Sequence, residues 1–379
     1  MAEYVRQMPE SAGPLNRAPS RATQVNVDIP LLILLLLLTA YGLLVLYSAS
    51  GQDMGAVVRQ GRYFVLAYLV MLGAAQIDLV RWSRWSPWGY LLGVALLLAV
   101  PFLGVGAKGA QRWLDFGGFR FQPSEIMKLA VPMTVAWYLG QRILPPRPRY
   151  VAACLALIAV PCGLIVRQPD LGTSLLIAAS GLFAIFMAGI SWRFIFGAAG
   201  AALVSLWPAW RFLLEDYQKQ RILTLLNPES DKLGAGWNII QSKTAIGSGG
   251  WAGKGWTQGT QSQLDFLPES HTDFIIAVLA EEFGLRGVLV LLALYLLILV
   301  RAFLIGLRAQ SSYGRILSGS LTLTFFVYIF VNMGMVAGLL PVVGVPLPLV
   351  SAGGTSVVTL MAGFGLLMAV GADQRVVGQ

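Results

Sequence analysis

The stretch "IPLLILLLLLTAYGLLVLY", from Ile29 to Tyr47, is an uncharged and predominantly apolar run of 19 residues. About 20 apolar residues cross the hydrocarbon core of a bilayer as an α-helix, so the run predicts a membrane span. It is too long for the hydrophobic region of a usual signal peptide, although the "SAS" that follows imitates a cleavage site. We therefore expect an uncleaved first span, preceded by a disordered cytoplasmic tail over residues 1–28.

The composition of the whole chain also indicates a membrane protein. Of its 379 residues, 56% are apolar and only 12% are charged, whereas a soluble domain carries about 25% charged residues. The net charge of +9 is not gathered in one patch, so we expect no nucleic-acid partner. Cys154 and Cys162 lie in one apolar segment and are interpreted as small filling residues, because a metal site needs more ligands.

Apolar segments of spanning length recur along the chain. Lipid offers no partner for open backbone groups, so each segment is expected to be a helix and the fold class to be all-α, a polytopic membrane protein. The predicted membrane domain covers residues 29–372 and is followed by a short cytoplasmic tail, 373–379. The ten predicted spans are 29–48, 63–79, 86–104, 124–141, 150–167, 171–190, 192–212, 273–300, 316–340 and 351–371.

The distribution of Lys and Arg predicts the orientation of these spans. With the N-terminus inside, the inner segments hold thirteen arginines and the short outer loops hold five basic residues. We therefore expect both termini in the cytoplasm and a large extracellular loop, 213–272, between spans seven and eight. That loop contains interleaved glycines and tryptophans, which favour a functional loop over a plain linker. Its stretch "NIIQSKTAIG" predicts a short amphipathic helix at the membrane interface.

Two groups of ionisable residues lie at span ends that are predicted to face outward. Such a residue inside a span costs about 2.5–3.5 kcal/mol and is a functional candidate by default. Glu125 and Lys128 of "PSEIMK" share a helix face. They form either an ion pair that only fixes packing or a charged cavity wall, with Arg112 and Arg120 nearby. The stretch "RQPDLGTS" is either a turn or half of a broken-helix site that aims Arg167 into the protein.

Two further outward-facing stretches have the same ambiguity. The end of the large loop carries Glu269, His271 and Asp273, and Ser270 and Asp273 have the spacing of a capping box. Asp273 therefore either starts a helix or performs chemistry at the membrane edge. Residues 332–356 contain three prolines and a Gly-Gly pair, which predict a rigid, re-entrant-like turn before the last span. This turn is either a stiff connection or a place where backbone approaches a substrate.

Four motifs, "FQPSEIMK", "RQPDLGTS", "LPESHTDFIIAVLAEEFG" and "VVGVPLPLVSAGGTS", occur in the order found in the SEDS family (shape, elongation, division and sporulation proteins). The chain resembles this family from the first span to the last, and within it the elongation branch rather than the division branch. The resemblance implies ten spans in the bacterial cytoplasmic membrane with a large extracellular loop. It also implies polymerisation of glycan chains from lipid II beside a class B penicillin-binding protein.

The same resemblance implies the site residues. The family's functional carboxylate falls on Asp273 of "HTDF", and its cavity charges fall on Glu125, Lys128 and Arg120, while Trp113 matches the family's "RW". Arg167, Glu269 and His271 are added as candidate substrate-binding residues. The preferred role for His271 is to order or cap the local backbone. It lies two residues from Asp273 at a helix start, so its side chain is expected to point to a different face of the helix.

The expected chemistry agrees with this residue set. A glycosidase needs a carboxylic acid to protonate a poor leaving group, but a lipid-linked diphosphate leaves as an anion. One base and positive charge are therefore sufficient. Asp273 is expected to take the proton of the acceptor's 4-hydroxyl, with inversion at the donor carbon. Arg120, Lys128 and Arg167 are expected to stabilise the diphosphate. Whether a divalent cation, Mg²⁺ or Mn²⁺, shares this task with Asp273 or Glu125 is left open. No closed metal site is visible in the sequence.

Two other classes of function fit ten spans with intramembrane charges. A lipid II flippase or other transporter would use the broken segments for alternating access, but the charges cluster at the outer edge without a matched inner group. A scaffold would hold a partner enzyme, and Glu125 and Lys128 would then be dispensable for activity. The membrane-lipid contacts expected of such a bundle are common to all three interpretations.

Overall fold

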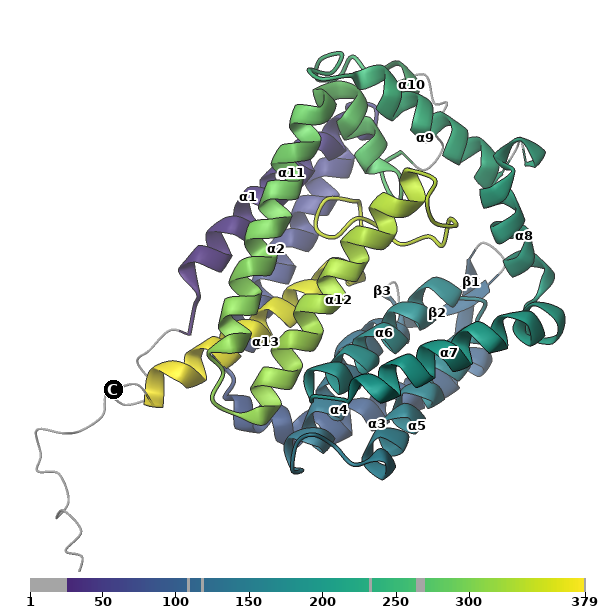
Figure 1. Cartoon of the computed structure of the whole chain (residues 1–379). Coiled ribbons are helices and arrows are strands. Elements are labelled where there is room, and N and C mark those ends of the chain that lie inside the picture. Colours follow the sequence, from purple (N-terminus) through teal and green to yellow (C-terminus); the bar gives the residue numbers. More distant parts are fainter. Residues whose placement is uncertain (1–25, 108–109, 117–118, 232–233, 264–269, 378–379) are drawn as a thin grey trace, which may run out of the picture.

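The structure is a computed structural model that describes residues 26–107, 110–116, 119–231, 234–263 and 270–377. Helices dominate these residues and pack side by side (Figure 1). One long helix lies near each predicted span: α1 Ile29–Ala49, α2 Met54–Gln76, α3 Leu79–Leu103, α4 Pro123–Gly140, α5 Pro148–Val166, α6 Leu171–Met187, α7 Trp192–Pro208, α11 Ile275–Leu307, α12 Ser312–Val336 and α13 Thr355–Val377.

Six of these helices, α1, α3, α5, α11, α12 and α13, are long and apolar enough to cross a membrane by length and composition. Large apolar side chains also stay exposed on their outer faces, for example Phe102, Leu296 and Phe330. A water-facing monomer rarely exposes so much contiguous apolar surface. The chain is therefore a multi-pass membrane protein with a polytopic helical fold, and the full count of ten spans stays a prediction.

The predicted start of the second span is nine residues too late. The helix α2 begins at Met54 because Asp53 caps it: the Asp53 carboxylate accepts hydrogen bonds from the backbone nitrogens of Gly55 at 2.7 Å and Ala56 at 3.1 Å. Asp at this position satisfies amide donors that have no partner inside the helix. The added residues 54–62 include Arg59, Gln60 and Arg62 among their apolar residues, so the apolar pattern alone does not reveal them.

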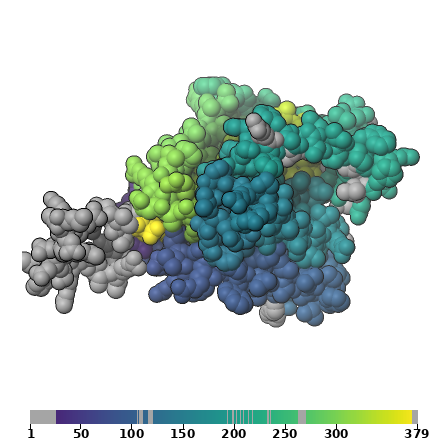
Figure 2. All heavy atoms as spheres, turned by 60° about the horizontal axis from the view of Figure 1, so that its bottom comes forward, coloured from purple at the N-terminus to yellow at the C-terminus, as the bar shows by residue number. Residues whose placement is uncertain are grey.

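The segment between α7 and α11, which is predicted to lie outside the membrane and is called the outer loop, is mostly helical in its described residues. It consists of the π-helical turn η3 Ala209–Leu213, α8 Asp216–Leu226, the 3₁₀ turn η4 Pro228–Ser230, α9 Ala235–Gly249 and α10 Thr260–Gln263. The predicted short helix in "NIIQSKTAIG" is confirmed as part of α9, and its place at the membrane interface stays a prediction. Figure 2 shows the helices as one continuous body, with the region of α8 and α9 extending at the right-hand side.

A small antiparallel sheet between α3 and α4 was not predicted. Its strands are β1 Gly104–Ala107, β2 Ala110–Phe116 and β3 Phe119–Phe121, in the order β1-β2-β3. The register places Leu114 opposite both Gly104 and Phe121, and Asp115 opposite Arg120. The strands have three to seven residues, too short for a clear alternation of apolar and polar residues. Strand β2 lies in contact with α4.

The sequence predicts one continuous span over 273–300. The corresponding helix, α11, is broken. Gly284 has φ 66° and ψ −162°, which divides α11 into an arm of residues 275–283 and an arm of residues 285–307. Residues 274–282 are buried without exception, whereas a lipid-facing helix would expose one side. The first arm is therefore enclosed by protein, the condition under which broken backbone is tolerated at membrane depth.

The outer loop supplies hydrogen bonds where α11 is broken. The backbone nitrogens of Lys254 and Gly255 donate to the carbonyls of Glu281 and Glu282, each at 3.0 Å, and Leu285 N donates to Gly250 O at 2.9 Å. A Cβ on Gly284 would lie 2.4 Å from Gly253 N. Glycine is therefore required at position 284 both by its left-handed φ and by the close approach of the loop.

We predict that Gly284→Ala destabilises the protein by roughly 1–3 kcal/mol or more, because this backbone region is nearly restricted to glycine. Thermal unfolding of the purified protein measures the effect. The matched control is Gly73→Ala, since a Cβ on this helical glycine meets no atom within 4 Å and alanine favours helix. Equal melting temperatures for Gly284→Ala and the wild type would contradict the assigned role.

The remaining long helices are fastened together at several points. The helix pairs α2 with α13, α3 with α4, and α12 with both α4 and α6 lie in contact, and α1 packs along α11. At the end opposite the outer loop, Arg301 donates to both carboxylate oxygens of Asp28, at 3.0 and 2.6 Å, and Asp28 caps α1 through Leu31 N. This frame fixes the starts of α4 and α11 relative to each other.

Candidate functional site

The predicted pairing of Glu125 and Lys128 is present in the first turns of α4. Pro123 occupies the start of the helix, where its missing N–H costs no hydrogen bond. Lys128 Nζ lies 2.6 Å from Glu125 Oε1, and the side chains are only 13% and 5% exposed. A buried ion pair of this kind loses much solvation and is weak evidence of stabilisation. Its position beside a cavity favours the interpretation of a charged cavity wall.

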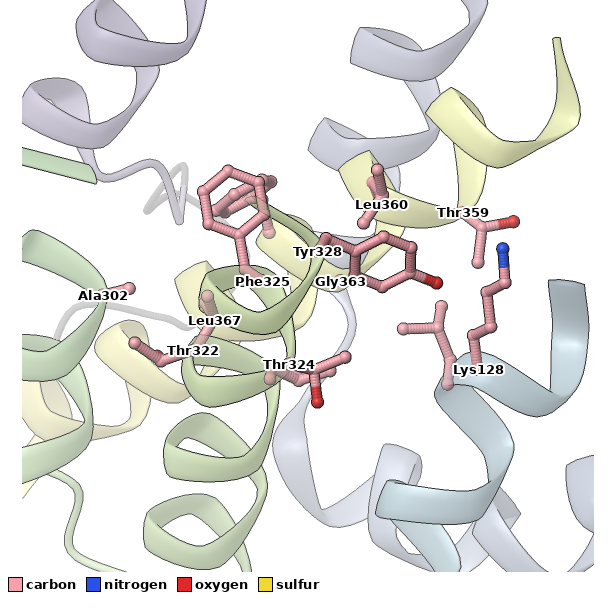
Figure 3. A pocket seen from close by; sticks show the side chains of 13 residues that line it. Lys128, Ala302, Thr322, Thr324, Phe325, Tyr328, Thr359, Leu360, Gly363 and Leu367 are labelled. Atoms are coloured by element: carbon pink, nitrogen blue, oxygen red, sulfur yellow. The ribbon is translucent and has the colours of Figure 1, made fainter. Parts of the chain in front are cut away.

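Lys128 borders a small cavity between α4, α12 and α13. The cavity has a volume of about 40 Å³, and its polar lining comes from Lys128, Thr322, Thr324, Tyr328 and Thr359. Figure 3 shows the Lys128 amine near Thr359, with the Tyr328 hydroxyl directed to the same side. Lys128 Nζ lies 5.5 Å from the centre of the Tyr328 ring. Tyr328 carried no signal in the sequence analysis, because an aromatic residue in an apolar helix is ordinarily packing.

Several buried polar atoms of α4 and α12 have no hydrogen-bond partner within the described part of the chain. They are Ser124 Oγ, Glu125 Oε2 and Asn332 Oδ1. An unmade hydrogen bond costs roughly 1–3 kcal/mol for each buried group, and buried polar groups in native proteins are nearly always paired. Their concentration on the facing surfaces of α4 and α12 indicates a place for water or a polar ligand.

The proline-rich segment 337–354 connects this cavity to the start of α11. It consists of turns and irregular backbone between α12 and α13 (Figure 1), and its predicted rigid, re-entrant-like character stays a prediction. Residues 346–349, Ser351 and Gly353 of the segment line a second small cavity, of about 20 Å³, together with Lys128 and Tyr328. At its other side, Asn332 Nδ2 donates to Asp273 O and to Val345 O, both at 2.8 Å. Asn332 therefore fixes the backbone of Asp273 against the segment.

Asp273 itself faces the same segment. A Cβ on Gly344 would lie 3.6 Å from Asp273 Oδ2, and Gly344 has a left-handed φ of 75°. Ser351 Oγ donates to Thr272 O, and Ala352 N donates to His271 O at 3.0 Å. Asp273 is partly buried and His271 is exposed. The structure therefore places Asp273 near Gly344 and Lys128 near residues 346–349 of the same backbone segment.

The structure rules out the capping-box alternative for Ser270 and Asp273. The helix α11 begins at Ile275, and its N-cap residue Phe274 makes no side-chain cap. Ser270 Oγ instead donates to Ala49 O at the end of α1, at 3.1 Å. The backbone of His271 is oriented by the hydrogen bond that its carbonyl accepts from Ala352 N, and not by a helix cap. Asp273 is thus left without the helix-starting role that its spacing suggested.

The break between α5 and α6 is organised by Arg112 rather than by Arg167. Arg112 Nη1 lies 3.7 Å from Asp170 Oδ2, and its Nε donates to Gln168 O at 3.0 Å. Asp170 caps α6 through Thr173 N and accepts from Gln122 Nε2, at 3.2 and 3.1 Å. The side chain of Arg167 is exposed, which favours the alternative of a turn over a half-site that aims Arg167 into the protein.

The other predicted residues fall into two groups. Trp113 lies on β2 opposite Val105 and is half-buried, and Arg120 lies on β3 opposite Asp115. The sheet thus places both near the start of α4 and the Arg112 contacts. Glu269 lies outside the described residues. Within those residues, no group of three or more His, Cys, Asp or Glu side chains comes together in a way that could hold a metal ion.

A buried carboxylate, which the sequence analysis did not assign a role, fastens the outer loop to the first arm of α11. Glu281 Oε1 accepts from Lys254 Nζ at 2.7 Å, from Thr260 N at 2.8 Å and from Gln261 N at 3.1 Å. Glu281 is 0% exposed. Glu282 beside it accepts from Ser48 Oγ of α1. These two carboxylates connect the loop, α1 and the arm that follows Asp273.

We predict that Glu281→Gln loosens the loop segment 254–261. A hydrogen bond to a charged group contributes about 1.5–3 kcal/mol, so the loss of charge should speed amide exchange in this segment by roughly tenfold or more. Hydrogen exchange followed by mass spectrometry measures the change. The control is Glu229→Gln, which removes an exposed carboxylate from η4. Unchanged protection of residues 254–261 in Glu281→Gln would contradict the role of Glu281.

Known proteins are similar to this chain over nearly its full length. The family model described as FtsW/RodA/SpoVE cell cycle protein matches residues 29–376. The peptidoglycan glycosyltransferase MrdB of Escherichia coli K12 is 52% identical over 357 residues, which cover 94% of this chain and 96% of that protein. A probable peptidoglycan glycosyltransferase FtsW of Trichlorobacter lovleyi is 35% identical over 373 residues, covering 95% of this chain and 96% of that protein.

Two solved structures have the same fold. A chain of a peptidoglycan synthase complex that coordinates polymerization and crosslinking superposes with a TM-score of 0.81 at 30% identity, covering 92% of this chain and 98% of that chain. The rod shape determining protein RodA of Thermus thermophilus superposes with a TM-score of 0.69 at 27% identity, covering 92% of this chain and 97% of RodA. The expected resemblance to the SEDS family and its elongation branch is confirmed, and the chain belongs to the FtsW/RodA/SpoVE family of cell cycle proteins.

Proposed function

We propose that this chain is a peptidoglycan glycosyltransferase that polymerises lipid II into glycan strands during cell elongation. The observation that carries the proposal is the position of Asp273 at the start of the buried arm of α11. There it lies against segment 337–354, whose other residues border the cavity of Lys128. The Asp273 carboxylate and the Lys128 ammonium group border one backbone segment, and we assign them to the proton and to the anionic part of the substrate.

In the proposed reaction, the 4-hydroxyl oxygen of the acceptor sugar attacks the anomeric carbon of the donor. The bond between this carbon and the diphosphate oxygen breaks, and the lipid-linked diphosphate leaves with the bonding electrons. The hydroxyl proton passes to the Asp273 carboxylate, which acts as general base. Attack opposite the leaving group inverts the donor carbon.

Positively charged side chains are proposed to stabilise the anionic leaving group. Lys128, held toward the cavity by Glu125 and Tyr328, stabilises the developing diphosphate charge. We assign Arg120 and Arg112, on the neighbouring sheet, to attracting the same diphosphate as the donor approaches the site. A divalent cation that shares this task would use carboxylates such as Glu125, whose Oε2 is buried and unpaired.

The enzyme is proposed to act with a partner protein and in a defined orientation in the membrane. The likeness to a chain of a peptidoglycan synthase complex supports an assembly with a class B penicillin-binding protein, the transpeptidase that crosslinks the strands. The arginine distribution supports an orientation with both termini in the cytoplasm and the site of Asp273 at the outer surface of the inner membrane.

The test uses purified protein with lipid II in detergent. Detergent micelles have no two compartments, so a flippase or a scaffold yields no product, whereas a polymerase yields glycan strands that separate on a gel. We expect a ladder of strands from the wild type. No polymer, with or without the class B partner, would contradict the proposed function and favour transport or scaffolding.

A further inference from the structure

An open apolar groove lies between α3, α4 and α5, away from the candidate site. Its volume is about 530 Å³, and its lining includes Pro87, Leu91, Trp137, Tyr138, Ala156 and Val160. Ligand pockets occupy roughly 300–1,000 Å³. Tyr138 follows Lys128 by ten residues on α4, which corresponds to about 15 Å along the helix axis. The groove is therefore a separate feature at the other end of α4.

Two polar side chains in the groove are satisfied internally. Tyr90 OH donates to Leu157 O at 2.8 Å, and Thr134 Oγ1 donates to Ser86 O at 2.9 Å. The rest of the lining is apolar or aromatic. Apart from the Trp137 indole N–H and the Tyr138 hydroxyl, the groove thus offers a hydrocarbon chain an apolar surface.

A cluster of arginines and tyrosines stands at the end of this groove. The Arg142 guanidinium carbon lies 5.2 Å from the ring centre of Tyr138 and 4.9 Å from that of Tyr150. Arg149 lies 4.7 Å from the Tyr150 ring and donates to its hydroxyl at 2.7 Å. Tyr138 belongs both to the groove and to this cluster, so the charged cluster and the apolar lining are continuous.

The charge of the cluster is not compensated within the described residues. Arg142, Arg147 and Arg149 are exposed, and none of them forms a salt bridge with a carboxylate of the described chain. Two guanidinium groups held against one tyrosine ring repel each other, and an anion between or beside them relieves the repulsion. Guanidinium forms paired hydrogen bonds with phosphate.

We propose that the groove binds an anionic glycerophospholipid. One acyl chain lies along α3, α4 and α5, and the phosphate of the headgroup contacts Arg142 and Arg149. Tyrosine side chains favour the level of the headgroups, which agrees with the place of Tyr138 and Tyr150 between the apolar groove and the arginines. The lipid ties together three helices, one of which carries Glu125 and Lys128 at its far end.

The test measures lipid binding to the purified full chain by native mass spectrometry. The probes are phosphatidylglycerol and phosphatidylethanolamine with identical acyl chains. The first variant is the double substitution Arg142→Gln with Arg149→Gln, and its control, Arg308→Gln with Arg315→Gln, removes two exposed arginines elsewhere. The second variant, Ala156→Trp, fills the groove, and its control is Ala159→Trp on an exposed position of α5 outside the lining.

We expect the wild type and both controls to bind phosphatidylglycerol in preference to phosphatidylethanolamine. The double arginine variant should bind it about 30-fold more weakly, because each arginine near an anionic headgroup contributes a factor of about five. Ala156→Trp should lose the bound lipid. Equal binding of the two lipids, or undiminished binding of phosphatidylglycerol in both variants, would overturn the proposal. Displacement of the lipid by a polyprenyl phosphate but not by excess phosphatidylglycerol would also overturn it.

Discussion

Asp273→Asn is expected to lower the turnover of lipid II polymerisation by about 10²- to 10⁴-fold, the contribution of a positioned general base. Asparagine keeps the size of the side chain and leaves the backbone contacts of residue 273 with Asn332 intact, but it cannot accept the proton of the acceptor hydroxyl. Substrate affinity should therefore change little. Initial rates over a range of lipid II concentrations separate kcat from KM.

The control for this variant is Asp216→Asn, which replaces a fully exposed carboxylate on α8. It should keep the wild-type rate. A variant Asp273→Asn with normal kcat and a raised KM would show that Asp273 binds substrate without acting as the base. That result would contradict the mechanism but leave the polymerase function standing.

Lys128→Met should be damaging in two separable ways. It removes the proposed diphosphate partner, and it leaves the Glu125 carboxylate buried without its cation. Breaking one partner of a buried pair costs about 3–5 kcal/mol, whereas replacing both partners by groups of similar volume is often close to neutral. Thermal unfolding and polymerisation assays on the same preparations separate the two effects.

The double variant, Glu125→Gln with Lys128→Met, makes the separation. We expect it to recover much of the thermal stability that Lys128→Met loses, because no uncompensated charge remains. Its polymerisation rate should stay low, since the ammonium group is still missing. Recovery of both stability and rate in the double variant would show that the pair only fixes packing, the alternative that its spacing left open.

Much of the membrane body could be predicted because its signals are local. A run of apolar residues such as 29–47 is sufficient to identify a helix in lipid, since no other backbone arrangement satisfies its hydrogen bonds there. The Glu125–Lys128 contact also follows from a spacing of three on one helix, and the structure has it at 2.6 Å. For these features the neighbouring residues along the chain contain the relevant information.

The features that shape the candidate site depend on contacts between distant parts of the chain. Gly284 breaks α11 where the loop around Gly253 approaches it, and the apolar residues that resume after Arg286 predict one span over both arms. Tyr328 and Asn332 matter because α12 packs against α4 and the start of α11. Ser270 has the spacing of a cap but donates to Ala49 instead. A local pattern cannot distinguish these outcomes.

The central claim is that Asp273, rather than the neighbouring His271, is the base of glycan polymerisation. The most direct measurement compares three purified proteins with lipid II in detergent on one gel: the wild type, Asp273→Asn and His271→Gln. We predict glycan strands from the wild type and from His271→Gln, and none from Asp273→Asn at matched protein concentration and time. Strands from Asp273→Asn at the wild-type level, or their loss in His271→Gln alone, would contradict the claim.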